Sequence, residues 1–467
     1  MKVIIWGTGK FYQNRKDELA EFHQIEIIAF CDNDNALWGK TMDGIFIIPP
    51  NKIKSLVYDA ILIMNIYEKE VQLQLLTMGI QEKQIIYWES FRAQILSGKR
   101  RVFYGKATRK NSDKRILIIS KYLTYDGGSV VAVYAAMALL SKGYEVVLAI
   151  PDGEPKFIEE ITNDDITVAI CPALPYVFDK EKEWIKEFNF VLVNVFPMMQ
   201  SAYASALLCP TVWWIHEATE IYGKVMDKPW NKVEEDKLCK LNIYAVSNPA
   251  KSNFNKLFSR QIKEILHYGI PDMSLKGLGV GKRQPKMIFA MIGTVCYGKA
   301  QDIFIEAIRH LNCNDRVEFW IIGYWDNGRF CEDLAQICRS ISSIKVFGVL
   351  TREEIYRVFP KIDVVVCVSR EDYLPIVMTE GMMFGKVCIA SDKTGTADYI
   401  HDGVNGFVVP VEKVGALKRR MEWMINNIEK LNEIGKKARE TYEKYFTIEE
   451  FGNNLEKVLL KAEKMKR

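Results

Sequence analysis

Two acidic residues flank the start of an apolar segment late in the sequence. Asp372 stands just before Pro375, and Glu380 lies within the apolar run of residues 376–384. A helix that is apolar on most of its faces is buried, and a buried carboxylate is costly unless a partner pairs with it or donates hydrogen bonds to it. We therefore expect Glu380 to have a polar partner. The alternative is that Asp372 caps the helix and Glu380 lies on the surface.

Other candidate residues stand where a strand-like run gives way to a helix-like one. Gly127 and Gly128 let the backbone approach a ligand, Ser129 can cap the following helix, and the free N–H groups of that helix favour an anion. A plain Gly-Gly turn is the alternative. His216 ends a run rich in tryptophan, and Lys299 stands just after another strand-like run. A single histidine in such a place is more often structural, but binding sites of α/β proteins gather at the carboxyl ends of strands, which favours a functional role for His216.

The elements that must position these residues alternate between strand and helix along almost the whole sequence. Many strand-like runs, such as VVLAI at 146–150 and VVVCV at 364–368, are continuously apolar. Such runs are typical of strands in parallel sheets that helices cover on both faces. The pattern therefore predicts an α/β fold.

The composition is that of a soluble globular protein and excludes several classes. The chain has 467 residues, enough for roughly three domains, with 49% hydrophobic and 26% charged residues. A net charge of +4, without a basic array interleaved with aromatics, argues against nucleic-acid binding. The 10 cysteines form no C-x-x-C pair and the five histidines are scattered, which predicts a reduced, cytosolic protein without a metal site. No run approaches ~18 consecutive apolar residues, so no membrane-spanning segment is predicted.

Two basic, weakly patterned stretches divide the chain. Residues 97–114 are predicted to form a linker after a first domain at residues 1–96. A second break, at residues 272–285, is rich in glycine and lysine. The remaining boundaries predicted from the sequence are 115–275 and 276–430 for two further domains, and 431–467 for charged terminal helices.

The first domain opens with a strand and a glycine turn. Gly7 and Gly9, with Asp32 at the end of the next strand, have the spacing of a dinucleotide-binding fingerprint, but Tyr12 stands at its third glycine position. A tight turn without a ligand explains these residues equally well. Most of residues 1–90 also resembles the small Rossmann-like domain at the front of bacterial sugar acyltransferases, where it holds a nucleotide-sugar.

From about Arg115 to the end, the sequence resembles the retaining glycosyltransferases of the GT-B fold, in the large family four class, or glycosyl transferases group 1. The stretch from Ser369 to Val409 carries most of this resemblance, because the family has two acidic residues eight positions apart, here Asp372 and Glu380. The resemblance implies two Rossmann-like domains that face a cleft. It assigns the acceptor to residues 115–275 and the donor to residues 276–430, with residues 431–467 crossing back to the acceptor domain.

The resemblance also implies a role for each candidate residue. Glu380 would accept hydrogen bonds from the ribose of a nucleotide-sugar, Asp372 would face the hydroxyls of its sugar, and Lys299 would neutralise its diphosphate. His216 would lie beside the donor sugar. Further donor-binding positions implied in this way are Gly127, Gly128, Gly293, Thr294, Leu374, Ile376 and Val377. The implied reaction retains the anomeric configuration, requires no metal or other cofactor, and uses a UDP-sugar by default.

The sequence departs from the family at three places. Asp372 is one methylene shorter than the usual glutamate, and Ala300 replaces the glycine after the lysine. The arginine that often accompanies the lysine is absent, because its two usual positions hold Thr294 and Gly298. Two cations nearby in the sequence are candidates to replace it: Arg370 and Lys393.

Three functions remain as hypotheses. The leading one is a glycosyltransferase acting on a glycan, lipid-linked or protein acceptor, in bacterial surface polysaccharide or glycoconjugate synthesis. The second is an inactive GT-B subunit that assists a partner transferase, which the missing arginine favours and the retained Lys299 and Glu380 oppose. The third, an oxidoreductase using the first glycine turn, lacks a hydride-transfer site.

The basic linker and the tail KAEKMKR fit either a solvated linker and helix end, or a peripheral contact with anionic lipid at the inner face of the cell membrane, at about 1 kcal/mol per basic residue.

Overall fold

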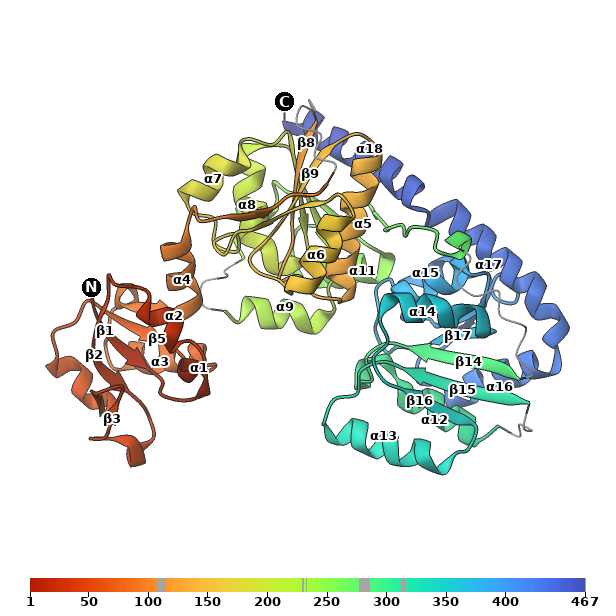
Figure 1. The fold of residues 1–467 in the computed structure, drawn as a ribbon, viewed down its shortest axis with the longest axis horizontal. Coiled ribbons are helices and arrows are strands. Elements are labelled where there is room, and N and C mark those ends of the chain that lie inside the picture. Colours follow the sequence, from red (N-terminus) through yellow and green to blue (C-terminus); the bar gives the residue numbers. More distant parts are fainter. Residues whose placement is uncertain (107–113, 229–230, 232, 277–285, 312–315, 467) are drawn as a thin grey trace.

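The computed structural model describes residues 1–106, 114–228, 231, 233–276, 286–311 and 316–466. Within these residues, three mainly parallel sheets follow one another along the chain, and helices pack around each of them (Figure 1). The α/β class predicted from the alternating apolar runs is thereby confirmed.

The first sheet has the strand order β3-β4-β2-β1-β5-β6, and only the short β3–β4 pair is antiparallel. Its strands are β1 (Lys2–Trp6), β2 (Glu26–Cys31), β3 (Thr41–Met42), β4 (Ile45–Ile48), β5 (Ala60–Ile63) and β6 (Ile85–Tyr87). The accompanying helices are α1 (Lys10–Gln13), α2 (Lys16–Ala20), α3 (Glu68–Thr77) and α4 (Trp88–Leu96).

The second sheet has the order β13-β12-β11-β8-β9-β10-β7. Its strands are β7 (Arg101–Phe103), β8 (Arg115–Ile119), β9 (Glu145–Ile150), β10 (Thr167–Ile170), β11 (Phe190–Asn194), β12 (Thr211–Ile215) and β13 (Asn242–Ala245). Its helices are α5 (Gly127–Ser141), α6 (Pro155–Asn163), α7 (Asp179–Ile185), α8 (Met199–Leu208), α9 (Thr219–Met226), α10 (Glu235–Leu238) and α11 (Asn248–Leu257). The segment predicted as a linker thus contains β7, which pairs antiparallel with β10 at the sheet edge, while residues 107–113 lie outside the described residues.

The third sheet is wholly parallel, with the order β16-β15-β14-β17-β18-β19. Its strands are β14 (Met287–Ile292), β15 (Val317–Ile322), β16 (Ile344–Phe347), β17 (Val364–Cys367), β18 (Val387–Ser391) and β19 (Phe407–Val409). Its helices are α12 (Gln301–Arg309), α13 (Arg329–Ser340), α14 (Arg352–Val358), α15 (Ile376–Met383) and α16 (Val414–Asn426).

Two terminal helices, α17 (Leu431–Tyr445) and α18 (Ile448–Lys466), join the third domain to the second. Helix α17 packs on α15, and α18 packs along α5 and β12, as the long blue helix in Figure 1 shows. Near its last turn α18 also contacts α8, because the Lys466 ammonium donates a hydrogen bond to the Ala206 carbonyl at 2.6 Å.

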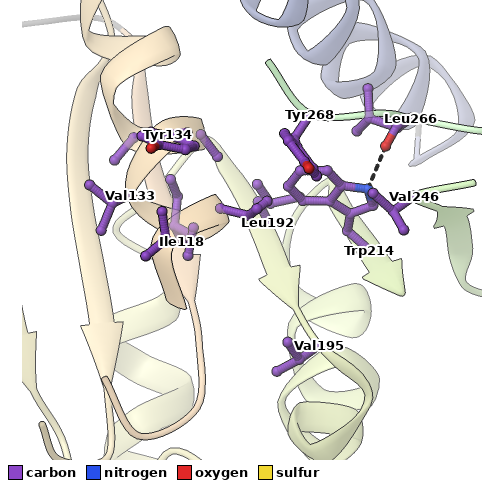
Figure 2. Close-up of a cluster of buried hydrophobic side chains, with 14 of the residues drawn as sticks. Ile118, Val133, Tyr134, Leu192, Val195, Trp214, Val246, Leu266 and Tyr268 are labelled. Atoms are coloured by element: carbon purple, nitrogen blue, oxygen red, sulfur yellow. Dashed lines mark hydrogen bonds between the residues drawn. The ribbon is translucent and has the colours of Figure 1, made fainter. Parts of the chain in front are cut away.

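The core of the second domain is built from its central strands and from α5, which is apolar on nearly all sides. Figure 2 shows Trp214 of β12 in this core, where its indole N–H donates to the Leu266 carbonyl at 2.7 Å. Because burying a tryptophan is favourable only when its N–H finds an acceptor, this bond places the indole precisely. The same cluster includes Tyr134 of α5 and Tyr268, whose hydroxyls reach toward the third domain.

Helix α15 lies unusually close to its sheet because of one glycine. A Cβ atom on Gly381 would stand 2.9 Å from Val365 Cγ2 and 3.0 Å from Cys388 Sγ, so a larger residue would push the helix away. The apolar residues around Gly381 are buried, as the sequence predicts for a helix without a polar face. Among the described residues, no helix combines the length and the apolar character needed to cross a membrane.

Candidate functional site

Lys299 and Asp372 meet at the carboxyl edge of the third sheet. The loops after β14 and β17 are joined there by a hydrogen bond from the Arg370 amide to the Gly298 carbonyl at 2.8 Å. The Lys299 ammonium forms an ion pair with the Asp372 carboxylate. Burial alone would lower the pKa of Lys299, but Asp372 outweighs it, and the pKa lies above its ordinary value. Lys299 is therefore a positive charge held in place at neutral pH.

The amino-terminal end of α15 lies beside this pair and opposite α5 of the second domain. Pro375 is the residue before the first helical turn, so the amides of Ile376 and Val377 are among those that lack an intrahelical acceptor. Ile376 also faces the second domain, because a Cβ atom on Gly127 would stand 3.9 Å from its Cδ1 atom. The two helix starts predicted as ligand-binding therefore face each other.

The helix start at Gly127 and Gly128 already carries an acidic cap. The predicted cap, Ser129, is wrong: Asp126 caps α5, accepting the Ser129 amide at 3.1 Å, because its carboxylate can reach back over the first turn. Asp126 also pairs with Lys121 at 3.0 Å. Burial acts to raise the pKa of Asp126, yet Lys121 and hydrogen bonds hold it below the ordinary value. A second anion would be repelled here, which leaves α15 as the better anion site.

Glu380 has a protein partner that the sequence did not reveal. The Arg352 guanidinium donates to Glu380 at 2.5 Å, and to the hydroxyls of Tyr134 at 2.7 Å and Tyr356 at 2.5 Å. Burial raises the pKa of Glu380, and Arg352 acts in the opposite direction. The polar partner that we expected is thus Arg352 in this structure, and a ribose would have to share or replace it.

Tyr268 of the second domain reaches the third domain just before α15. Its hydroxyl donates to the Leu374 carbonyl at 2.8 Å, just before α15. Burial raises the pKa of Tyr268, and the nearby carboxylates of Asp372 and Glu380 raise it further. Both acids therefore lie around one buried side chain of the second domain, at the contact between the two domains.

His216 lies at the carboxyl end of β12 with its ring edge against Trp214, at 4.2 Å between ring centroids. Its Nε2 atom and the Oδ1 atom of Asn194, at the end of β11, are buried without a hydrogen-bond partner among the described residues. Burial, and then the charge of Lys121, lower the pKa of His216 to about 3, so the ring is neutral. Unsatisfied buried polar atoms are uncommon, and ligand hydroxyls would satisfy these two.

The next residue, Glu217, is also buried and was not singled out in the sequence. Its carboxylate accepts the His216 amide at 2.9 Å, and burial raises its pKa to about 7. Glu217 and His216 therefore form adjacent buried groups with pKa values displaced in opposite directions. Groups of this kind are more frequent at functional sites than elsewhere.

The remaining predicted positions lie in loops near Lys299. Gly293 follows β14 with φ +145°, and Thr294 beside it is exposed. Ala300 has φ +61°, which explains why glycine suits this position. Of the two cations considered as substitutes for the missing arginine, Arg370 is held by Asp302 at 2.7 Å and by Glu412 at 2.9 Å, whereas the Lys393 side chain is exposed.

The sequence did not point to Arg352, because its partner Glu380 lies 28 positions away in the chain. One local signal was nevertheless present. Residues 351–354 form a capping box in which Thr351 and Glu354 bond each other's backbone amides. This box places the positive charge of Arg352 in the first helical turn, where the helix dipole disfavours it. A cation in such a position indicates a partner elsewhere in the fold.

In the first domain, the three predicted ligand residues shape a turn. Gly7 has φ +114°, and a Cβ atom there would stand 2.7 Å from the Met64 carbonyl oxygen. The Asp32 carboxylate accepts the Thr8 hydroxyl at 2.6 Å and the Thr8 amide at 3.1 Å. Gly9 precedes α1, which spans only residues 10–13. These contacts account for the shape of the turn, and a ligand role of the three residues stays a prediction.

Comparison with protein families gives two matches. Residues 279–441 match the model of glycosyl transferases group 1, and residues 1–86 match the C2185-like N-terminal domain. An uncharacterized glycosyltransferase of Methanocaldococcus jannaschii is 27% identical over 156 residues. The matched region spans 33% of this chain and 42% of that relative, which is less than half of its length. The match does not test the resemblance of the first domain to sugar acyltransferases, which stays a prediction.

Two solved structures have a similar fold over about three quarters of this chain. Anabaena HepE, solved in complex with UDP and glucose, is 14% identical with a TM-score of 0.61 over 74% of this chain and 100% of its own. A glycosyltransferase of Rickettsia africae is 15% identical with a TM-score of 0.61, over 75% of this chain and 99% of its own. Residues 279–441 are therefore similar to glycosyl transferases group 1, residues 1–86 are similar to the C2185-like N-terminal domain, and the described part of the chain has the GT-B fold.

Proposed function

We propose that this protein is a retaining glycosyltransferase that moves a sugar from a UDP-sugar to a hydroxyl of a glycan, lipid-linked or protein acceptor. The observation that carries the proposal is the Lys299–Asp372 ion pair beside the free amino-terminal end of α15. A fixed ammonium and a set of aligned amides form a site for a diphosphate, with a carboxylate next to it for the sugar hydroxyls.

The chemistry follows from where charge develops. The bond between the anomeric carbon and the diphosphate breaks, a new bond forms from that carbon to the acceptor oxygen, and the acceptor proton passes to the departing diphosphate. Negative charge grows on the leaving group, and donors that are already aimed at it lower the barrier most. Lys299 and the amides of Ile376 and Val377 are these donors. Attack from the side of the leaving group would retain the anomeric configuration.

The nucleotide and the sugar are assigned to neighbouring groups. Glu380 would accept the ribose hydroxyls, with Arg352 moving aside or bonding the same ligand. The unpaired atoms of His216 and Asn194 would bond hydroxyls of the donor sugar. UDP is our choice of nucleotide because the similar structure of HepE was solved with UDP-glucose. For the acceptor we favour surface polysaccharide or glycoconjugate synthesis in the cytoplasm, at or near the inner face of the membrane.

A single experiment tests activity and nucleotide together. The purified protein is incubated with UDP-, GDP- and ADP-sugars, and release of nucleoside diphosphate is measured with and without an extract of bacterial glycans as acceptor. We expect release from a UDP-sugar, and proton NMR of the product should show the anomeric configuration of the donor. The proposal would be refuted if the protein bound none of the nucleotide-sugars tightly, or if it released nucleoside diphosphate from none of them.

One observation favours a non-catalytic role. Each acid already has a partner in the chain, since Asp372 pairs with Lys299 and Glu380 pairs with Arg352. An inactive GT-B subunit would keep such pairs for stability and assist another transferase. Co-purification with a second transferase, together with no turnover by this protein alone, would support that role over catalysis.

A further inference from the structure

We infer that the N-terminal domain forms one wall of a saccharide-binding pocket, which holds the acceptor for transfer. That the ligand of this pocket is the acceptor rests on the proposed function. That the ligand is a saccharide follows from the residues that line the pocket. The pocket has a volume of about 580 Å³ and lies between the first and second domains. Residues of both domains line it, among them Arg15, Glu18 and Glu89 of the first and Tyr122, Asp152 and Tyr176 of the second.

The wall from the second domain consists of loops that follow parallel strands. Tyr122 follows β8, Asp152 follows β9, and Pro172 follows β10. Carboxyl ends of parallel strands are where α/β proteins bind their ligands, so this wall belongs to the binding edge of the sheet. The N-terminal domain covers that edge with residues of α2, α4 and the turn after α1.

Ion pairs hold the N-terminal domain against the second domain. Glu68 pairs with Lys228, and Lys69 pairs with Asp227, both at 2.7 Å. Glu68 is only 5% exposed, so its pair is the stronger of the two, because water screens it less. Asp227 and Lys228 directly follow α9, the helix that begins after His216 and Glu217. The contact therefore attaches the domain to the same edge as the candidate site.

One loop connects the pocket with the candidate site. In the loop between β8 and α5, Tyr122 lines the pocket, whereas Lys121 and Asp126 form the ion pair at the start of α5. Gly127, next in the chain, faces Ile376 of α15. An acceptor bound in the pocket would therefore extend past this loop toward the donor sugar.

The charges of the pocket favour a neutral ligand. Its two arginines are already paired, Arg92 with Glu18 at 2.5 Å and Arg15 with Glu89 at 3.8 Å. Asp152 adds a third carboxylate, so two positive groups face three negative ones. A phosphate or another polyanion would meet no free cation there, and it would be repelled rather than bound.

The shape and the side chains of the pocket favour a saccharide among neutral ligands. Planar carboxylate, amide and guanidinium groups can bond adjacent hydroxyls in pairs, and the ring of Tyr176 with Pro172 and Pro175 offers an apolar surface for C–H groups. A volume of about 580 Å³ lies within the range of small-molecule sites, which is roughly 300–1,000 Å³. The pocket therefore fits a short oligosaccharide segment.

The test uses the full chain with UDP present at saturation. Binding of maltotriose and of triacetylchitotriose is measured by saturation-transfer NMR, with inorganic phosphate as a charged competitor. Asn14→Trp fills the pocket from an exposed position, and Asn35→Trp, on the exposed surface of the same domain, is the matched control. Tyr122→Ala removes part of the opposite wall, with the exposed Tyr67→Ala as its control.

We expect at least one trisaccharide to bind the unaltered protein, and binding to weaken more than 10-fold in Asn14→Trp but not in Asn35→Trp. Tyr122→Ala should weaken it several-fold, and release of UDP from UDP-glucose should stay unchanged in the two control variants, Asn35→Trp and Tyr67→Ala. The inference would be overturned if neither trisaccharide bound the unaltered protein, if Asn14→Trp bound a trisaccharide as well as the unaltered protein does, or if phosphate displaced the bound trisaccharide. Failure of the proposed function would appear separately, as no UDP release by the unaltered protein.

Discussion

Arg352 and Glu380 form an ion pair at the contact between the second and third domains. Their atoms Nη2 and Oε1 lie 2.5 Å apart, and the same Arg352 nitrogen donates to the Tyr134 hydroxyl of the second domain at 2.7 Å. Glu380 is 5% exposed and Tyr134 also 5% exposed. In the proposed donor complex, a ribose at Glu380 would share or displace Arg352, which would couple its binding to rotation of this arginine or to movement of the two domains.

Replacing Arg352 should destabilise the fold, because it leaves a buried carboxylate without its cation. Arg352→Met should lower the free energy of unfolding by about 2 kcal/mol, less than for a fully buried pair, since the arginine side chain is 33% exposed. Urea denaturation measures this change. The double variant Arg352→Met/Glu380→Gln should recover most of the loss, and a single variant as stable as the original protein would contradict the role of this pair.

Removing the Lys299 charge should abolish donor turnover with little effect on nucleotide specificity. Lys299→Ala takes away the cation that we propose for the diphosphate, and losing such a donor typically costs about 10²- to 10³-fold in rate. Nucleoside diphosphate release measures it. Lys361→Ala, an exposed lysine of the same domain, is the control and should turn over normally. Equal rates in the two variants would show that Lys299 does not contact the donor.

The adjacent residues His216 and Glu217 should give opposing pH dependences of stability. The pKa of Glu217 is raised from 4.5 to about 7, so its contribution is full below pH 4.5 and is lost as the pH rises through 7. The pKa of His216 is lowered from 6.5 to about 3, so its contribution is full above pH 6.5 and is lost as the pH falls toward 3. Between pH 4.5 and 6.5 the two slopes cancel, each about 1.4 kcal/mol per pH unit.

Single substitutions should expose these hidden slopes. Glu217→Gln should lose stability between pH 6.5 and 4.5, because only the His216 dependence remains. His216→Asn should gain stability over the same interval. Thermal unfolding at several pH values measures both variants against the unaltered protein, and parallel curves for all three proteins would be inconsistent with these pKa values.

Ala300→Gly should stabilise the third domain. Ala300 has the left-handed φ of +61°, which costs an L-residue roughly 1–2 kcal/mol, whereas glycine adopts it freely. The larger backbone entropy of glycine in the unfolded chain and the lost methyl contacts offset part of this. We therefore expect the free energy of unfolding to rise by up to about 1 kcal/mol. Ala307→Gly, equally buried but inside α12, should instead lose about 1 kcal/mol. Thermal unfolding compares the two, and a loss in both would rule out strain at Ala300.

The sequence by itself determined the class of fold and the location of the charged loops. Continuous apolar runs specified strands buried on both faces, because only helix-covered parallel sheets bury both sides of a strand. The glycine-rich and charged loops that follow these strands had to meet at one edge, which is why Lys299 and Asp372 could be expected near each other. The pattern of residues 369–386 specified a buried helix with a polar requirement at Glu380.

Only the tertiary structure decided which group meets that requirement. Arg352 and Tyr134 lie 28 and 246 positions from Glu380, and the packing of α14, α15 and α5 brings them together. The cap of α5 was likewise decided by geometry, since Asp126 and Ser129 are both good capping residues and only the turn angle selects one. The N-terminal domain contacts the second domain through the ion pair of Glu68 and Lys228, which lie 160 positions apart, so no local pattern encodes it.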